Sequence, residues 1–99
     1  MFNKKQLYQI ELGIIAGVDV SWYAKPEFDW EQMEQVRWGL LDGFNVSSYA
    51  KPEFSWQQMR EIWFGLGYGL EVSIYAKPEF TWGQMAGIRL RLEKEKNNV

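Results

Sequence analysis

The chain repeats itself every 26 residues, and this period constrains its fold more than any other feature. The segment Tyr-Ala-Lys-Pro-Glu-Phe begins at Tyr23, Tyr49 and Tyr75. Each copy continues with a short polar residue, a tryptophan, one variable residue and Gln-Met, and a half copy opens the chain. Because a unit this short cannot bury its apolar face alone, neighbouring units must stack. The period therefore predicts a repeat protein.

Each copy carries the signals of a helix start. The residue after Pro-Glu-Phe varies but is always a preferred N-cap: Asp29, Ser55, Thr81 and, in the half copy, Asn3. A glutamine stands three residues later in every copy, which completes a capping box. The first full copy then predicts a helix over residues 30–42, and Gly43 stands where a C-terminal glycine would end it.

A short segment separates consecutive long helices and is closed by a proline such as Pro52. We expect one helical turn there, with its tyrosine and valine against the long helix. The predicted fold is all-α, a helical repeat in the form of a small α-solenoid or a compact bundle. One domain covers residues 1–99, with a half repeat at 2–22, repeats at 23–48 and 49–74, a truncated repeat at 75–93 and a frayed polar tail at 94–99.

Apolar residues at positions i, i+3 and i+7 of each predicted helix form the expected core stripe. The members are Leu7, Ile10, Ile14, Met33, Val36, Leu40, Met59, Ile62, Leu66, Met85, Ile88 and Leu92. Gly13, Gly39 and Gly65 recur in mid-helix, where glycine costs about 1 kcal/mol relative to alanine. That recurring cost predicts the close approach of a neighbouring helix or turn.

The opposite helix face is polar except for one large apolar residue in each copy, namely Leu12, Trp38, Phe64 and Leu90. Two interpretations fit this row. It is either a second packing face between repeats or an exposed apolar stripe that binds a partner. Under the second interpretation Arg60 and Tyr68, which flank Phe64, join the four as candidate partner-binding residues. Trp, Tyr and Arg are enriched at interface hot spots.

Other tryptophans are expected to serve packing. Trp30, Trp56 and Trp82 begin the predicted helices, where they would secure one repeat against the next. Trp63 takes the place of Arg37 and Arg89 near the edge of the core stripe, so we expect it to pack as well.

The composition argues against catalysis. The chain has no histidine and no cysteine, which removes the commonest general base, the commonest metal ligand and thiolate chemistry. It has no phosphate-binding loop or dinucleotide motif, and equal repeats offer no asymmetric constellation of side chains. We therefore expect a non-enzymatic protein with no catalytic residue, metal or cofactor.

The net charge and the hydropathy of the chain restrict the classes of partner that we expect. A net charge of −2 gives no direct signal for nucleic acid. No apolar run approaches the roughly 20 residues of a membrane span, and the first residues lack a signal-peptide core. The expected location is intracellular and the expected partner is another protein.

The repeat also resembles a known type. The copies YAKPEFDWEQMEQVRWGLLDGFNVSS and YAKPEFSWQQMREIWFGLGYGLEVSI look like the tandem repeats YAxPEFxWxQMxxIRxGLxxGLDVS of gut Firmicutes proteins, which are often associated with phages, plasmids and conjugative elements. Such copies usually carry leucine at the position of Trp38 and Phe64, so the aromatic residues here favour a specialised binding face.

The resemblance implies a bacterial cytoplasmic protein and leaves three hypotheses. The first is a general protein-interaction module built of helical repeats. The second is a phage- or plasmid-encoded inhibitor of a bacterial defence system, such as an anti-CRISPR protein, that blocks a protein surface. The third is a structural repeat that self-associates.

Overall fold

The helices lie where the repeat predicts them. The computed structural model describes residues 1–98 and contains four long helices: α1 (Lys4–Ala16), α2 (Trp30–Leu41), α3 (Trp56–Gly67) and α4 (Trp82–Asn97). Three one-turn 3₁₀ helices follow the first three of them: η1 (Val20–Trp22), η2 (Val46–Ser48) and η3 (Val72–Ile74). Residues 1–98 contain no strand, so the predicted all-α class is confirmed.

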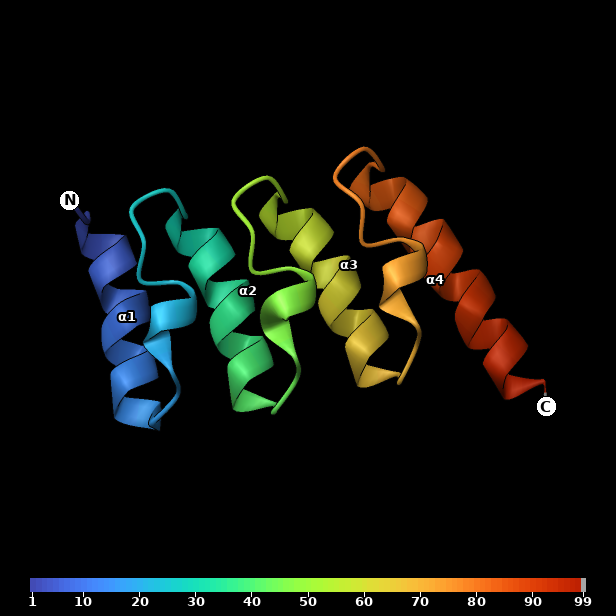
Figure 1. Cartoon of the computed structure of the whole chain (residues 1–99), viewed down its shortest axis with the longest axis horizontal. Helices are drawn as coiled ribbons and strands as arrows, with labels where there is room; N and C mark the ends of the chain where they lie inside the picture. Colours follow the sequence, from blue (N-terminus) through green and yellow to red (C-terminus); the bar gives the residue numbers. More distant parts are fainter. Residues whose placement is uncertain (99) are drawn as a thin grey trace.

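The long helices form a single row. Each one packs against the next in the chain, all four run in the same direction, and the two termini lie at opposite ends of the row (Figure 1). The molecule measures 45 × 26 × 16 Å. This elongated arrangement is that of a small solenoid, because the first and last helices do not close against each other. No helix within residues 1–98 combines the length and the apolarity that a membrane crossing requires.

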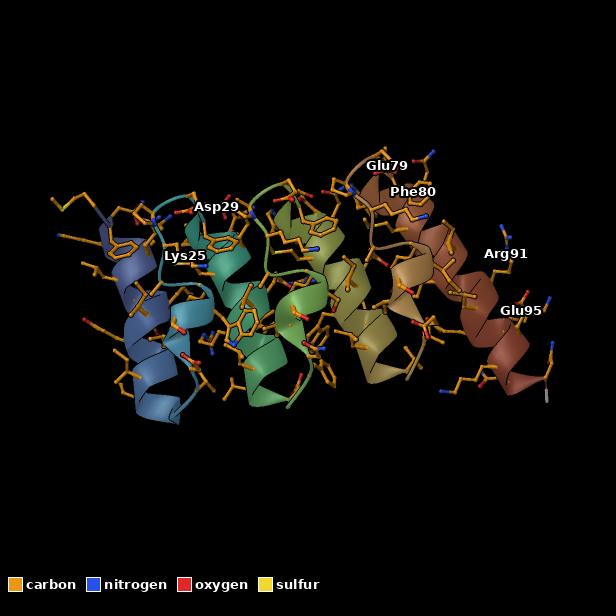
Figure 2. The ribbon with its side chains drawn as sticks, in the orientation of Figure 1. Lys25, Asp29, Glu79, Phe80, Arg91 and Glu95 are labelled. Atoms are coloured by element: carbon orange, nitrogen blue, oxygen red, sulfur yellow. The ribbon has the colours of Figure 1, made fainter. Side chains whose placement is uncertain are left out.

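All four helices begin with the predicted capping box. At the start of α2, where Figure 2 labels Asp29, the Gln32 backbone N–H donates to the Asp29 carboxylate and the Asp29 N–H donates to Gln32 Oε1. The Gln32 side chain does more than cap. Its Nε2 donates to the carbonyls of Pro52 at 3.0 Å and Phe54 at 2.6 Å, so it also holds the loop that leads into α3.

The mid-helix glycines admit a tyrosine from the following short segment. The hydroxyl of Tyr49 donates to the carbonyl of Gln35 at 2.6 Å, directly beside Gly39. A Cβ at Gly39 would lie 2.1 Å from that hydroxyl and 2.7 Å from Val46 Cγ1. Burial raises the pKa of Tyr49 well above its ordinary value of about 10, so the phenol stays a donor. The expected close approach is confirmed, and the same contact recurs in the other two junctions.

The core stripe is confirmed in α2, α3 and α4 but is partly wrong in α1. Met33 and Met59 are fully buried, whereas their counterpart Leu7 is 44% exposed and Ile14 is 61% exposed. The reason is positional. The buried residues of α1 are Gln6, Gln9 and Gly13, on the side that contacts the following unit, and Leu7 and Ile14 lie outside that contact.

The segment expected to be a frayed tail is helical as far as Asn97. Lys96 Nζ donates to the carbonyls of Tyr68 at 2.8 Å and Gly69 at 3.1 Å, so the end of α4 caps the end of α3. Lys94 and Lys96 also lie in the last turn, where cations stabilise the negative end of a helix. Val99 lies outside the described residues.

Candidate protein-binding surface

The row of Leu12, Trp38, Phe64 and Leu90 is unevenly exposed. Leu12 and Trp38 are half-buried, whereas Phe64 is 36% and Leu90 is 56% exposed. Of the two flanking residues, Arg60 is half-buried and Tyr68 is 54% exposed. The row is therefore neither a fully buried packing face nor a uniform stripe, and its character changes at the junction of α2 with α3.

Aromatic side chains gather at that junction. We call Trp38, Phe44, Trp63, Phe64 and Tyr68 the aromatic cluster. The ring centroids of Trp38 and Trp63 are 5.7 Å apart with an interplanar angle of 51°, and those of Trp63 and Phe64 are 5.2 Å apart at 59°. Tilted pairs at these distances are favourable aromatic contacts. The cluster thus joins α2 and α3 by contacts that remain partly open to solvent.

Two apolar hollows lie on either side of Trp63. One has a volume of about 250 Å³ and is lined by Phe44, Trp63, Phe64, Gly67 and Tyr68. The other, of about 310 Å³, is lined by Trp38, Leu41, Asp42 and Trp63. Trp63 is the wall between them, and its Nε1 donates to the Asp42 carboxylate at 3.0 Å. The prediction that Trp63 packs is therefore incomplete, because the same ring also lines both hollows.

The first hollow exists because Gly67 has no side chain. The equivalent residue is Ile15 in α1, Leu41 in α2 and Glu93 in α4. A Cβ at Gly67 would lie 3.6 Å from the ring of Phe44, which is ordinary contact, so the backbone does not require glycine here. The packing of the repeat explains the glycines beside the tyrosines, but it does not explain this one.

The departures from the repeat are concentrated in this surface. Aromatic residues stand at positions 44, 63 and 68, where every other copy has a non-aromatic residue, and at positions 38 and 64, where α1 and α4 carry leucine. Glycine replaces a larger residue at position 67. The other copies show what the fold requires at each position. These substitutions lie together on one surface and are not needed for the repeat to fold. They therefore indicate that this surface has a function besides packing.

Trp63 also leaves a buried acceptor without a donor. In the neighbouring junctions an arginine reaches back to the preceding helix, where Arg37 Nε donates to Gln9 Oε1 at 3.0 Å and Arg89 Nε donates to Glu61 Oε1 at 2.9 Å. Trp63 holds the equivalent position facing Gln35. Gln35 is 1% exposed, and its Oε1 has no hydrogen-bond partner among the described residues. An unsatisfied buried acceptor costs about 1–3 kcal/mol.

We expect Trp63→Arg to raise the free energy of unfolding by about 1 kcal/mol. The new guanidinium supplies the missing bond to Gln35, and this gain outweighs the loss of aromatic contacts, which are worth about 0.5–1.5 kcal/mol. Urea denaturation followed by circular dichroism measures the difference. Trp63→Ala is the control, since it removes the ring without supplying a donor and should be destabilised. A Trp63→Arg protein less stable than wild type would show that Trp63 is kept for packing.

Arg60 borders the cluster and lies close to two aromatic rings. Its guanidinium carbon lies 5.1 Å from the centroid of Trp38 and 5.1 Å from that of Trp56. A third hollow, of about 360 Å³, is lined by Arg60 together with Trp56 and Trp82. Trp56 is half-buried and Trp82 is 54% exposed, so the helix-start tryptophans pack less completely than expected.

Sequence reasoning identified part of this surface. Trp38, Arg60, Phe64 and Tyr68 were candidates and meet at the junction, whereas Leu12 and Leu90 lie on the outer helices. Phe44 and Gly67 were not singled out. The signal for both was present, since each differs from its counterpart in every other copy.

Among residues 1–98, no three of the residues His, Cys, Asp and Glu are grouped in a way that could hold a metal ion. Comparison with protein families, curated proteins and solved structures finds no match to this chain.

Proposed function

We propose that this protein is a non-enzymatic interaction module that binds another protein through the aromatic cluster. The observation that carries the proposal is the unsatisfied Oε1 of Gln35. A tryptophan is kept at position 63 at the expense of a bond made in both neighbouring junctions, and that tryptophan lines two open apolar hollows. A surface residue that lowers the stability of the fold is typical of a functional site.

The composition of the surface supports a protein partner. Large aromatic rings with adjacent arginine are the residues that dominate binding energy in protein interfaces. Apolar hollows bordered by polar groups such as the Asp42 carboxylate provide sites for the side chains of a partner. The inhibitor of a bacterial defence system, implied by the resemblance of the repeat, would use such a surface to occupy its target, and it remains a prediction.

The variant Gly67→Leu tests the proposal by filling the first hollow. Leucine occurs at the equivalent position of α2, so the helix accepts it, and we expect no loss of stability. A photo-crosslinking amino acid at Tyr68 first identifies the partner in a bacterial lysate. The dissociation constant of that purified partner is then measured for both proteins, and it should rise at least about 30-fold for Gly67→Leu, as for a hot-spot change.

The control is Gly87→Leu, the same change on α4 at a glycine with nothing within 4 Å of the added Cβ. It should bind the partner like wild type. Equal binding by the folded Gly67→Leu protein would contradict the proposal. Cross-links only between copies of this chain would instead favour the self-associating repeat.

A further inference from the structure

The strongest unassigned feature of the surface is the charge of Arg60. Its guanidinium carbon lies 5.1 Å from the ring centroid of Trp38 and 5.1 Å from that of Trp56. Its Nε is buried and has no hydrogen-bond partner among the described residues. The guanidinium makes no hydrogen bond within residues 1–98, and its planar pair of N–H donors matches the two oxygens of a carboxylate.

Arg60 lacks the counter-ion that a similar arginine has nearby. Arg89 also lies over an aromatic ring, 5.0 Å from the centroid of Phe64, but it is paired with both Glu61 and Glu93. Within residues 1–98, Arg60 makes no ion pair. Two acidic side chains that border the surface are engaged elsewhere, because Glu61 bonds to Arg89 and Asp42 bonds to Trp63 Nε1. The site therefore presents an oriented positive charge without its anion.

Resting on the proposed function, we infer that the partner contributes a peptide segment in which an acidic side chain lies close to a large apolar side chain. The carboxylate binds the guanidinium of Arg60. The apolar side chain enters the hollow formed by Phe44, Trp63, Phe64, Gly67 and Tyr68.

The spacing of the two subsites defines the segment. Arg60 and Phe64 are one turn apart on α3, which is about 6 Å along the helix axis. Residues i and i+2 of an extended strand are separated by about 6.6–6.8 Å, and residues i and i+4 of a helix by about 6 Å. The segment thus carries Asp or Glu two positions from the apolar residue if it is extended, and four positions away if it is helical.

The charge of the chain and of this surface favours a peptide over a nucleic acid as the bound partner. Arginine and aromatic rings also bind single-stranded nucleic acid, but such sites track a backbone with many cations. This chain has a net charge of −2, and its cluster borders a single arginine without an ion pair. One charge beside apolar hollows suits one carboxylate on a peptide.

Selection from a random 12-residue peptide display library tests the inference. Separate selections are made on the wild-type protein, on Arg60→Gln and on Gly67→Leu. Wild type should enrich peptides with an acidic residue two or four positions from a large apolar one. Arg60→Gln should keep the apolar preference and lose the acidic one, which also shows that this variant is folded. Gly67→Leu should lose the apolar preference.

A double-mutant cycle on one selected peptide gives the sharper result. Replacing its Glu by Gln should weaken binding to wild type by about 10-fold and leave binding to Arg60→Gln unchanged. Arg60→Lys should recover little of the affinity that Arg60→Gln loses, because the ammonium group of lysine lacks the planar pair of N–H donors of a guanidinium.

The possible failures are distinguishable. Apolar peptides that depend on Gly67 but show no acidic preference would overturn the role of Arg60 and leave the proposed function standing. Identical enrichment on wild type and Gly67→Leu, or no enrichment at all, would overturn the proposed function itself. Displacement of a selected peptide by a twelve-nucleotide oligothymidylate, dependent on Arg60, would show that the site takes nucleic acid instead.

Discussion

A Gly39→Ala protein will be less stable than wild type by about 3 kcal/mol, although alanine is the better helix former. The added Cβ would stand 2.1 Å from the hydroxyl of Tyr49 and 2.7 Å from Val46 Cγ1, so the 3₁₀ turn must move away from α2. Overpacking costs about 1–3 kcal/mol, and the displaced phenol loses its buried bond to Gln35 at a further cost of about 1–3 kcal/mol. Helix propensity returns only about 1 kcal/mol.

Thermal and urea unfolding measure this loss, which corresponds to a midpoint lower by roughly 12–24 °C for a domain of this size. Gly87→Ala on α4 is the matched control, because nothing lies within 4 Å of its added Cβ, and it should be stabilised by about 1 kcal/mol. Adding Tyr49→Phe to Gly39→Ala should recover part of the loss by removing the atom that clashes. Equal stability of the two alanine variants would show that the tyrosine does not require the glycine.

Gln32→Ala will cost about 3 kcal/mol because one side chain serves two elements. The substitution removes the bond from the Asp29 N–H and both bonds from Nε2 to the loop before α3. The carbonyl of Phe54 loses a 2.6 Å bond in a buried setting, where an unsatisfied acceptor costs about 1–3 kcal/mol. The capping bond adds about 0.5–1 kcal/mol to that loss.

Gln84→Ala separates the two contributions. Within the described residues the side chain of Gln84 makes only the capping bond from the Thr81 N–H and no bond to the loop of another repeat. We expect it to lose about 0.5–1 kcal/mol by the same urea titration. If the two glutamines cost the same, the bonds between repeats do not hold the array together.

The sequence predicted the elements well because their signals are local. The four N-caps with their glutamines fixed the start of every long helix, and Gly43 and Gly69, with φ values of 74° and 70°, stand just after the ends of α2 and α3. The close approach of a turn to the mid-helix glycines also followed from the sequence, since a cost repeated in three copies needs a repeated cause. That the approaching group is the tyrosine hydroxyl did not follow from it.

The missed features depend on residues that only the fold brings together. The second role of Gln32 joins it to a carbonyl 22 residues away, and the partner of Gln35 is lost at a position 28 residues away. Neither separation in sequence corresponds to the period of a helix or a strand. The residue pattern within one helix therefore cannot predict these contacts. The exposure of Leu7 and the helical end at Lys96 depend on which neighbours a terminal unit has or lacks.

The uncovered stripe of α1 gives the array one direction in which it can lengthen. A duplicated unit placed before α1 would cover Leu7 and Ile14 as the existing units cover the later helices. A unit placed after α4 would bring its tyrosine against Arg91, which stands where the other helices have glycine and lies on the side of α4 that faces away from α3 (Figure 2). A unit added before α1 would thus meet an apolar stripe, whereas a unit added after α4 would meet an arginine side chain where its tyrosine packs on a glycine in the other junctions.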